Sequence, residues 1–294
     1  MKKIISLLFI SAIISTSIIS CEDLEVSSSV SSEKPSSVVS NIDSISLEVE
    51  PDDAPKVFEG CENKEIVDGW VPTWCEEFNY EGKPDESIWN YQVGGNGWGN
   101  GEHQYYTKGE NVEVKDGFLH IIARKEKYGG KEYTSSRINT SGKADFKYGR
   151  FDIRAKLPRT KGSWPAIWMM PTKGVYGGWP RSGEIDIMEH SATYALNHYM
   201  GTIHTKAYHH SIGTQKGSGY IKYDKYHPGG TNLVDDFHVY SIIWEPGSIT
   251  WLFDDYPYYK LTAAELYKPS IEPYEAWPFD QEFHFLLNVA IGGG

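Results

Sequence analysis

The chain has 294 residues, a formal net charge of -12 and an aromatic content of 14%, with 10 Trp and 20 Tyr. Its length allows one large β domain or two ordinary domains with a substantial core. The acidic balance argues against a nucleic-acid partner, because phosphate binding needs clustered Lys and Arg, so we expect an uncharged partner such as a sugar chain, on which aromatic rings can stack.

The first 20 residues are typical of an export signal, with Lys2 and Lys3 before an apolar run from residue 4 to about residue 14. The run is too short to predict a membrane span. It ends in "IISC", which resembles the bacterial lipoprotein processing box and predicts lipidation of Cys21; an ordinary secretory signal is the alternative. We therefore expect either a bacterial cell-surface or outer-membrane lipoprotein, attached to the membrane only through its lipid anchor, or a secreted protein.

Residues 21–62 are rich in Ser, Val, Asp and Glu, which predicts a flexible tether. Residues 63–294 are predicted to form the globular domain. Cys61 and Cys75 stand near its start, and an exported chain meets an oxidising compartment. A disulfide between them would add about 3 kcal/mol to stability. Two separate thiols remain equally open, because spacing alone does not show whether the Cα atoms approach.

Short alternating runs dominate the chain from about Trp70 onward, separated by Gly, Pro and Asn. They predict strands within residues 117–126, 148–157, 183–189, 199–205, 236–246, 248–258 and 282–291. One short helix is predicted near "TAAELY", residues 262–267. The Gly-rich segment 94–102 lacks the Lys-Ser/Thr of a phosphate-binding loop. This pattern indicates an all-β, two-sheet antiparallel sandwich or a related barrel.

The segment "SGEIDIMEH", residues 182–190, places three carboxylates within six positions. On a regular strand Glu184 and Asp186 share one face, whereas Glu189 falls on the other. Glu189 returns to the carboxylate face if one extra residue is absorbed, so we expect a β-bulge at Met188.

A bulged strand would bring the two glutamates within joint reach of one glycosidic bond. Glu184 and Glu189 would lie roughly 13 Å apart along the backbone at ~3.3 Å per residue. Side chains that lean toward each other on a concave sheet approach the separation of about 5–5.5 Å that glycoside hydrolysis with retention requires. Asp186 between them would separate the two pKa values. The alternative is a solvated strand edge. Three nearby tryptophans favour the site: Trp164 and Trp179 as stacking platforms, with Trp168 expected in the core.

Six motifs in this order resemble the laminarinase-type members of glycoside hydrolase family 16: "GGNGWGNGEHQYYT", "YGRFDIRAKLP", "GSWPAIWMMP", "SGEIDIMEH", "GTIHT" and "WPFDQEFHFLLNVAIGG". The likeness covers nearly all of residues 74–294. It implies a concanavalin-like β-jelly-roll sandwich with an open cleft on the concave face, and endo-hydrolysis of β-1,3-glucan with retention. It also implies Glu184 as nucleophile, Glu189 as acid/base and Asp186 as assisting carboxylate. The residue inserted at Met188 is kept in laminarinases and absent from members restricted to mixed-linkage glucan.

The same resemblance implies the substrate contacts. Trp164 and Trp179 would stack on glucosyl units, His204 would lie close to the catalytic pair, and Asn96 and Arg137 would contact sugar. His209 and His210 have no third partner at a metal-ligand spacing, so we expect them in a surface loop.

No cofactor is expected for catalysis, although family members often bind a structural calcium, and Glu77 and the backbone near Gly117 match two of its ligands. The third usually comes from a last strand beyond residue 294, so the sequence is expected to be a fragment or to close its sandwich differently.

Other activities remain open. They are hydrolysis of mixed-linkage glucan, hydrolysis of an algal galactan (agar, carrageenan or porphyran), transglycosylation, and non-catalytic β-glucan binding. The presence of both glutamates argues against a binding module, and the acidic charge argues against sulfated galactans. We expect a monomer with a β-glucan polysaccharide as its partner.

Overall fold

The computed structural model describes Cys61, residues 69–225 and residues 232–293. The predicted signal peptide, Cys21 and the tether, apart from Cys61, lie outside the described residues. Among the residues that the structure describes, none of the helices has the length and apolar character that a membrane crossing requires.

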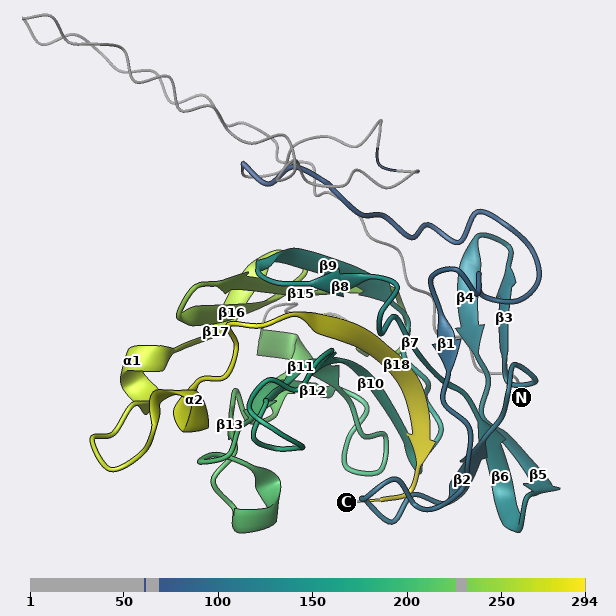
Figure 1. Ribbon diagram of the computed structural model, residues 1–294. Helices are drawn as coiled ribbons and strands as arrows, with labels where there is room; N and C mark the ends of the chain where they lie inside the picture. Colours follow the sequence, from purple (N-terminus) through teal and green to yellow (C-terminus); the bar gives the residue numbers. More distant parts are fainter. Residues whose placement is uncertain (1–60, 62–68, 226–231, 294) are drawn as a thin grey trace, which may run out of the picture.

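The larger sheet has nine strands and carries the predicted carboxylates (Figure 1). Its order along the main path is β1 (Asn90–Tyr91), β7 (Arg137–Asn139), β18 (Phe283–Ile291), β10 (Ser163–Pro171), β11 (Glu184–Glu189), β12 (His198–His204) and β13 (Lys216–Gly217). Two short strands extend it: β8 (Asp145–Phe146) pairs with β18, and β14 (Ile221–Lys222) pairs with β12.

A four-stranded sheet covers one face of the larger sheet (Figure 1). Its order is β17 (Tyr256–Thr262), β16 (Ser248–Phe253), β15 (His238–Glu245) and β9 (Gly149–Ala155). Two smaller sheets flank the pair, one of β2 (Gln104–Tyr106), β6 (Lys131–Ser135) and β5 (Arg124–Tyr128), the other of β3 (Val112–Lys115) and β4 (Phe118–Ile121). The all-β, two-sheet antiparallel jelly-roll prediction is confirmed, although β2 and β6 pair in parallel.

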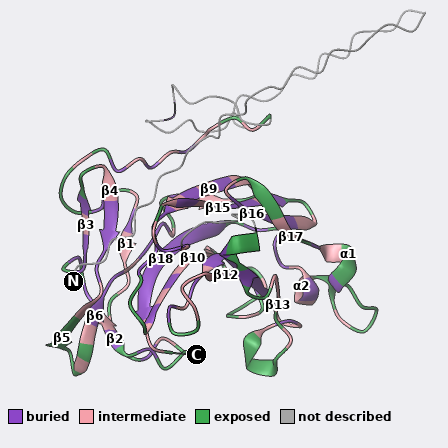
Figure 2. Ribbon diagram, turned by 180° about the vertical axis from the view of Figure 1, so that it is seen from behind, coloured by how far each residue is buried: buried purple, intermediate pink, exposed green. Residues whose placement is uncertain are grey.

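Strand β10 shows how one segment serves both the core and the cleft. Pro165, Ile167 and Met169 are buried, and the residues between them are partly exposed. Since successive side chains point to opposite faces, the buried set packs between the two large sheets, where Figure 2 shows the buried residues concentrated. Each fully buried large aliphatic side chain there contributes about 1.5–3 kcal/mol to folding. The other face of β10 is left for the functional site.

Two of the predicted strand segments are each divided in the structure. Residues 117–126 contain β4 and the start of β5, and residues 248–258 contain β16 and the start of β17. The second division lies at Asp254 and Asp255, which both have positive φ, a conformation that Asp tolerates in turns.

Two short helices precede β18. Helix α1 (Ala263–Leu266) lies within the predicted helical segment and begins with a capping box between Thr262 and Glu265. Helix α2 (Pro273–Ala276) was not predicted; it begins with a proline at its first position, where the missing N–H costs nothing. Short 3₁₀ turns occur at His210–Ile212 and Tyr223–Lys225.

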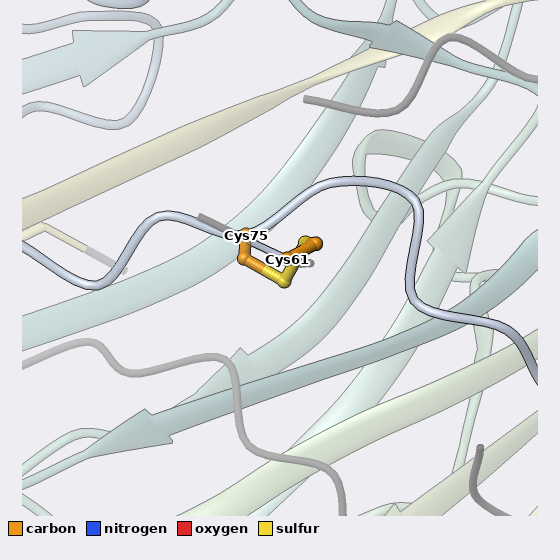
Figure 3. The surroundings of a disulfide bond; sticks show 2 residues. All are labelled: Cys61 and Cys75. Atoms are coloured by element: carbon orange, nitrogen blue, oxygen red, sulfur yellow. A yellow bond between two sulfur atoms is a disulfide. The ribbon is translucent and has the colours of Figure 1, made fainter. Parts of the chain in front are cut away.

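Cys61 and Cys75 form a disulfide (Figure 3), one of the two arrangements that the sequence left open. Their Cα atoms are 5.5 Å apart, and their positions in the chain differ by 14. Cys61 is buried, as is Trp74 beside Cys75. The bridge therefore joins Cys61 to the segment that leads into the core.

Candidate active site

The predicted β-bulge is present in β11 and places all three carboxylates on one side. Glu184 pairs with His204 and Glu189 with Met200, so five residue steps on β11 oppose four on β12. The shift spans Ile187 and Met188, and relative to β10 the extra residue is Ile187, one position before the one expected. Ile187 and Met188 are both buried in the core. Glu189 is thereby returned to the face that carries Glu184.

A cavity of about 310 Å³ lies over this face. Seven residues predicted from the sequence line it: Arg137, Trp164, Trp179, Glu184, Asp186, Glu189 and His204. The alternate residues of β10 and the end of β18 supply much of the remaining wall, including Ala166, Trp168, Asn288 and Ala290. Paired carboxylates surrounded by aromatic rings in a concave site are typical of sugar-cleaving enzymes.

Each terminal glutamate of the trio accepts a hydrogen bond from a tryptophan. The indole Nε1 of Trp179 donates to Glu184 Oε2 at 2.5 Å, and that of Trp164 donates to Glu189 Oε1 at 3.0 Å. Trp179 is 40% exposed despite its size, so its ring remains available for stacking. The two rings predicted as platforms therefore also orient the two carboxylates.

Asp186 lies beside His204, whose Nε2 is 3.4 Å from Asp186 Oδ2. The backbone N–H of His210 donates to His204 Nδ1 at 3.3 Å. Because Nδ1 accepts, a neutral His204 carries its proton on Nε2, facing Asp186. His204 thus lies at ion-pair distance from the buried central carboxylate, although its ring N–H does not form a hydrogen bond with Asp186 Oδ2.

The three carboxyl groups have raised pKa values. Burial, followed by the charge of Asp186, raises the pKa of Glu184 to about 8. Burial, followed by the charge of Glu184, raises the pKa of Glu189 to about 7. The pKa of Asp186 is also raised, by burial and then by Glu189. Because the negative charge on one carboxylate disfavours ionisation of the other two, the three carboxyl groups together retain protons at neutral pH. Their titration steps belong to the three groups together and not to single residues. A carboxylic acid beside a carboxylate is therefore available.

Arg137 forms the wall of the cavity together with two aromatic rings. Its guanidinium lies 4.8 Å from the ring centroid of Trp98 and 4.6 Å from that of Trp168. The indole of Trp168 donates to Asn288 Oδ1 at 2.8 Å. The expectation that Trp168 belongs to the core is wrong: it is partly exposed and lines the cavity. Both faces of β10 are rich in apolar residues, so its sequence pattern does not separate the core face from the cleft face.

A buried polar cluster adjoins this wall and fixes its geometry. Glu102 Oε2 accepts hydrogen bonds from Gln104 Nε2 at 2.5 Å and from the Tyr106 hydroxyl at 2.9 Å. Asn288 Nδ2 donates to the same hydroxyl at 3.2 Å. Burial lowers the pKa of Arg137, whereas Tyr106 and Glu102 act in the opposite direction. Charge pairing with Glu102 therefore helps to keep this buried guanidinium ionised.

Asn96 does not reach the cavity. It is exposed, and its Oδ1 accepts the backbone N–H of Trp98 at 3.1 Å. This short-range turn contact positions the segment that carries Trp98. The structure thus gives Asn96 a supporting contact, while Trp98 and Asn100 from the same segment line the cavity.

Sequence reasoning missed several of the lining residues, among them four that the contacts described above connect to the site. Trp98, Glu102, His210 and Asn288 all border the cavity. His210, expected in a surface loop, lies with its ring centroid 5.2 Å from that of Trp179 and 5.1 Å from that of His204. The quoted motifs contain Trp98, Glu102 and Asn288, but nothing in their spacing distinguishes them from structural residues.

The predicted calcium ligands lie elsewhere. Glu77 belongs to the segment before β1, and Gly117 lies in the turn between β3 and β4 with φ of 73°. In the described part of the chain, the Asp, Glu and His side chains that could hold one metal ion are those of Glu184, Asp186 and His204, whose ligand atoms lie within 4.8 Å of one another. These are the residues of the candidate active site, so a calcium site at Glu77 stays a prediction.

Comparison with known proteins agrees with this geometry. Residues 99–280 match the model of the glycosyl hydrolases family 16. The "Beta-glucanase" of Rhodothermus marinus is 48% identical over 238 residues, which cover 80% of each chain. The "Glucan endo-1,3-beta-glucosidase" of Cryptopygus antarcticus is 39% identical, covering 76% of this chain and 81% of the relative. The solved laminarinase from Rhodothermus marinus superposes with a TM-score of 0.68 at 49% identity, covering 75% of this chain and 85% of that structure. The chain belongs to glycosyl hydrolase family 16.

Proposed function

We propose that the protein is an endo-acting, retaining hydrolase of β-1,3 linkages in laminarin-type β-glucans. The observation that carries this proposal is the bulge of β11, which sets Glu184, Asp186 and Glu189 along one aromatic-lined cavity. Its relatives include a laminarinase and a glucan endo-1,3-beta-glucosidase, as their names state. A β-glucan polysaccharide is the corresponding partner.

The reaction has two displacements. In the first, Glu184 attacks the anomeric carbon while Glu189 gives its proton to the glycosidic oxygen, so that a covalent glycosyl-enzyme and a free chain end are formed. In the second, Glu189 takes a proton from water, which attacks the same carbon and releases Glu184. Burial raises the pKa values of all three carboxyl groups, that of Glu184 even more than that of Glu189, so the set retains a proton at neutral pH; the reaction requires this proton on Glu189. The indole of Trp179 stabilises the ionised form of Glu184.

Product analysis on three polysaccharides tests the substrate. Laminarin, lichenan and agarose are incubated with the protein, and product sizes and new reducing ends are followed over time. Early appearance of mixed oligosaccharides from laminarin supports endo-cleavage of β-1,3-glucan. Preferential cleavage of agarose, or of lichenan without laminarin, would contradict it.

Azide rescue tests the roles of the two glutamates. Glu184→Ala and Glu189→Ala should both lose laminarin hydrolysis, by about 10²–10⁴-fold for the acid. With azide and an activated aryl glycoside, the nucleophile variant should yield the α-glycosyl azide and the acid/base variant the β-glycosyl azide, because only the latter still forms the covalent intermediate. The opposite assignment of anomers would exchange the two roles.

We also propose that the chain is exported and anchored by a lipid on Cys21. The support is the sequence alone, since these residues lie outside the described part. Labelled palmitate should enter the full chain expressed in a bacterium and be lost in Cys21→Ser. Labelling of neither protein would leave secretion through an ordinary signal as the interpretation.

A further inference from the structure

Three side chains of the catalytic cavity form a compact set of possible metal ligands. Glu184, Asp186 and His204 each offer one ligand atom, and these atoms lie within 4.8 Å of one another. The two carboxylates come from β11, and His204 comes from the end of β12, where it pairs with Glu184. Two carboxylate oxygens and one imidazole nitrogen are a donor set that suits zinc, whose sites with three protein ligands keep an open fourth position.

Asp186 has one oxygen that lacks a hydrogen-bond partner. The residue is only 3% exposed, and its Oδ2 accepts no hydrogen bond from the part of the chain that the structure describes. Buried polar atoms normally have such a partner. The nearby Nε2 of His204 is 3.4 Å from this oxygen, beyond the usual range of an N–H···O bond. Two ligand atoms that each lie about 2.0–2.1 Å from a tetrahedral zinc ion are about 3.3–3.4 Å apart. The spacing of these two atoms therefore fits two ligands of one ion.

The cavity gives an ion access to this set. Glu184, Asp186 and His204 all line it, so an ion can enter from solvent and keep a water molecule as its fourth ligand. Coordination through Nε2 of His204 requires the imidazole proton to lie on Nδ1. This atom accepts the backbone N–H of His210 at 3.3 Å, a long hydrogen bond that metal binding would break. The change of tautomer therefore costs one weak contact.

We propose that Glu184, Asp186 and His204 form an inhibitory site for a divalent transition-metal ion of the zinc class. The inhibition rests on the proposed function, whereas binding of the ion does not. A coordinated Glu184 has no lone pair directed at the anomeric carbon, so the first displacement cannot begin. The positive ion also offsets the repulsion between two carboxylates that are held close together. Mg²⁺ and Ca²⁺ prefer six or more oxygen ligands and therefore fit this donor set poorly.

Calorimetric titration with zinc chloride tests binding without any need for activity. The full chain, without a histidine tag, should bind one ion. Asp186→Asn and His204→Ala should each weaken binding by more than about tenfold, because loss even of a group that only supports a ligand costs 10–100-fold in affinity. Asp186→Asn keeps the size of the side chain, and thermal melts show whether each variant is folded. His103→Gln is the matched control at an exposed histidine outside the set, and it should keep the parent's affinity.

Inhibition is measured with the parent and His103→Gln, at laminarin concentrations well below KM. Zinc chloride at ten times its dissociation constant should leave about a tenth of the rate in both proteins, and a chelator should restore it. Magnesium chloride at the same concentration should have no effect. A parent that binds no zinc, folded variants with the parent's affinity, or equal inhibition by magnesium would overturn the inference. A parent that binds zinc through these residues but does not cleave laminarin would count against the proposed function instead.

Discussion

The indole nitrogen of Trp251 donates a 2.9 Å hydrogen bond to the main-chain carbonyl of Asp186. Trp251 belongs to β16 of the four-stranded sheet and is completely buried, whereas Asp186 is the central carboxylate residue of β11. One sheet thus contacts the bulged strand of the other at the residue where its register begins to shift. The position of the carboxylates depends on this contact as well as on the pairing of β11.

Trp251→Phe should impair catalysis in addition to stability. Loss of the donor removes a buried hydrogen bond to the carbonyl of Asp186, which costs about 0.5–1.5 kcal/mol of unfolding free energy. Because β11 loses its hydrogen bond to the four-stranded sheet, the carboxylates are held less precisely. We therefore expect kcat on laminarin to fall about tenfold, equivalent to ~1.4 kcal/mol, with KM little changed. Denaturant unfolding and steady-state kinetics measure the two effects.

Trp244→Phe is the control for that variant. Trp244 is also completely buried, and its Nε1 donates at 3.2 Å to the carbonyl of Phe279, a residue that is not part of β11. It should lose a similar amount of stability and keep its kcat. Equal kcat losses in the two variants would show that general destabilisation, and not the contact with Asp186, is responsible.

Gly201→Ala should destabilise the protein from the other side of the same contact. Gly201 lies on β12, opposite the bulge of β11. A Cβ on this residue would lie 2.2 Å from Cδ1 of Trp251. Overpacking of this kind costs about 1–3 kcal/mol. Since Phe lacks the five-membered ring, the double variant with Trp251→Phe should be more stable than the sum of the single losses predicts. Strict additivity in a denaturant series would contradict the proposed packing.

The bulge was predictable because the three carboxylates of one segment do not fit the two-residue alternation of a regular strand. Three carboxylates at positions 184, 186 and 189 fit one face only if a residue is absorbed, and the apolar residues between them fit the core. Its register was not predictable to the residue, since Ile187 and Met188 are both apolar and either satisfies the pattern. Pairing with β10 decides that Ile187 is the extra residue.

The rest of the cavity wall depends on contacts between distant segments. Arg137 from β7 lies between Trp98 and Trp168, which precede and follow it in the chain by more than 30 residues. Local sequence patterns give no information on contacts between residues so far apart in the chain. The same holds for His210, which contacts Trp179 and His204 only because a loop after β12 folds back.

The disulfide should stabilise the fold without affecting the active site. Closing the loop between Cys61 and Cys75 contributes about 3 kcal/mol by restricting the unfolded chain. The double variant Cys61→Ser, Cys75→Ser should therefore unfold at a lower temperature and keep its kcat at 25 °C. Reducing agent should lower the melting temperature of the parent and leave the variant unchanged. An equal response of both proteins to reductant would show that the bridge is not the cause.

The catalytic carboxylates should make the protein less stable as pH rises. The pKa of Glu184 is raised from 4.5 to about 8 in the folded state, so the folded chain binds more protons than the unfolded one between these values. Stability then decreases as pH increases through this window. Glu184→Gln removes the cost of ionising a buried group beside Asp186, and should be more stable than the parent by about 1–3 kcal/mol at pH 8.

This gain should disappear near pH 4, where the parent's Glu184 is protonated in both states. Thermal melts at several pH values measure the difference, and Glu110→Gln, at an exposed glutamate, serves as the control with little change at either end. The variant loses the nucleophile, so a higher melting temperature would accompany the loss of activity, as expected where function requires like charges to be held close together. A stability difference that is independent of pH would mean that packing, and not ionisation of Glu184, separates the two proteins.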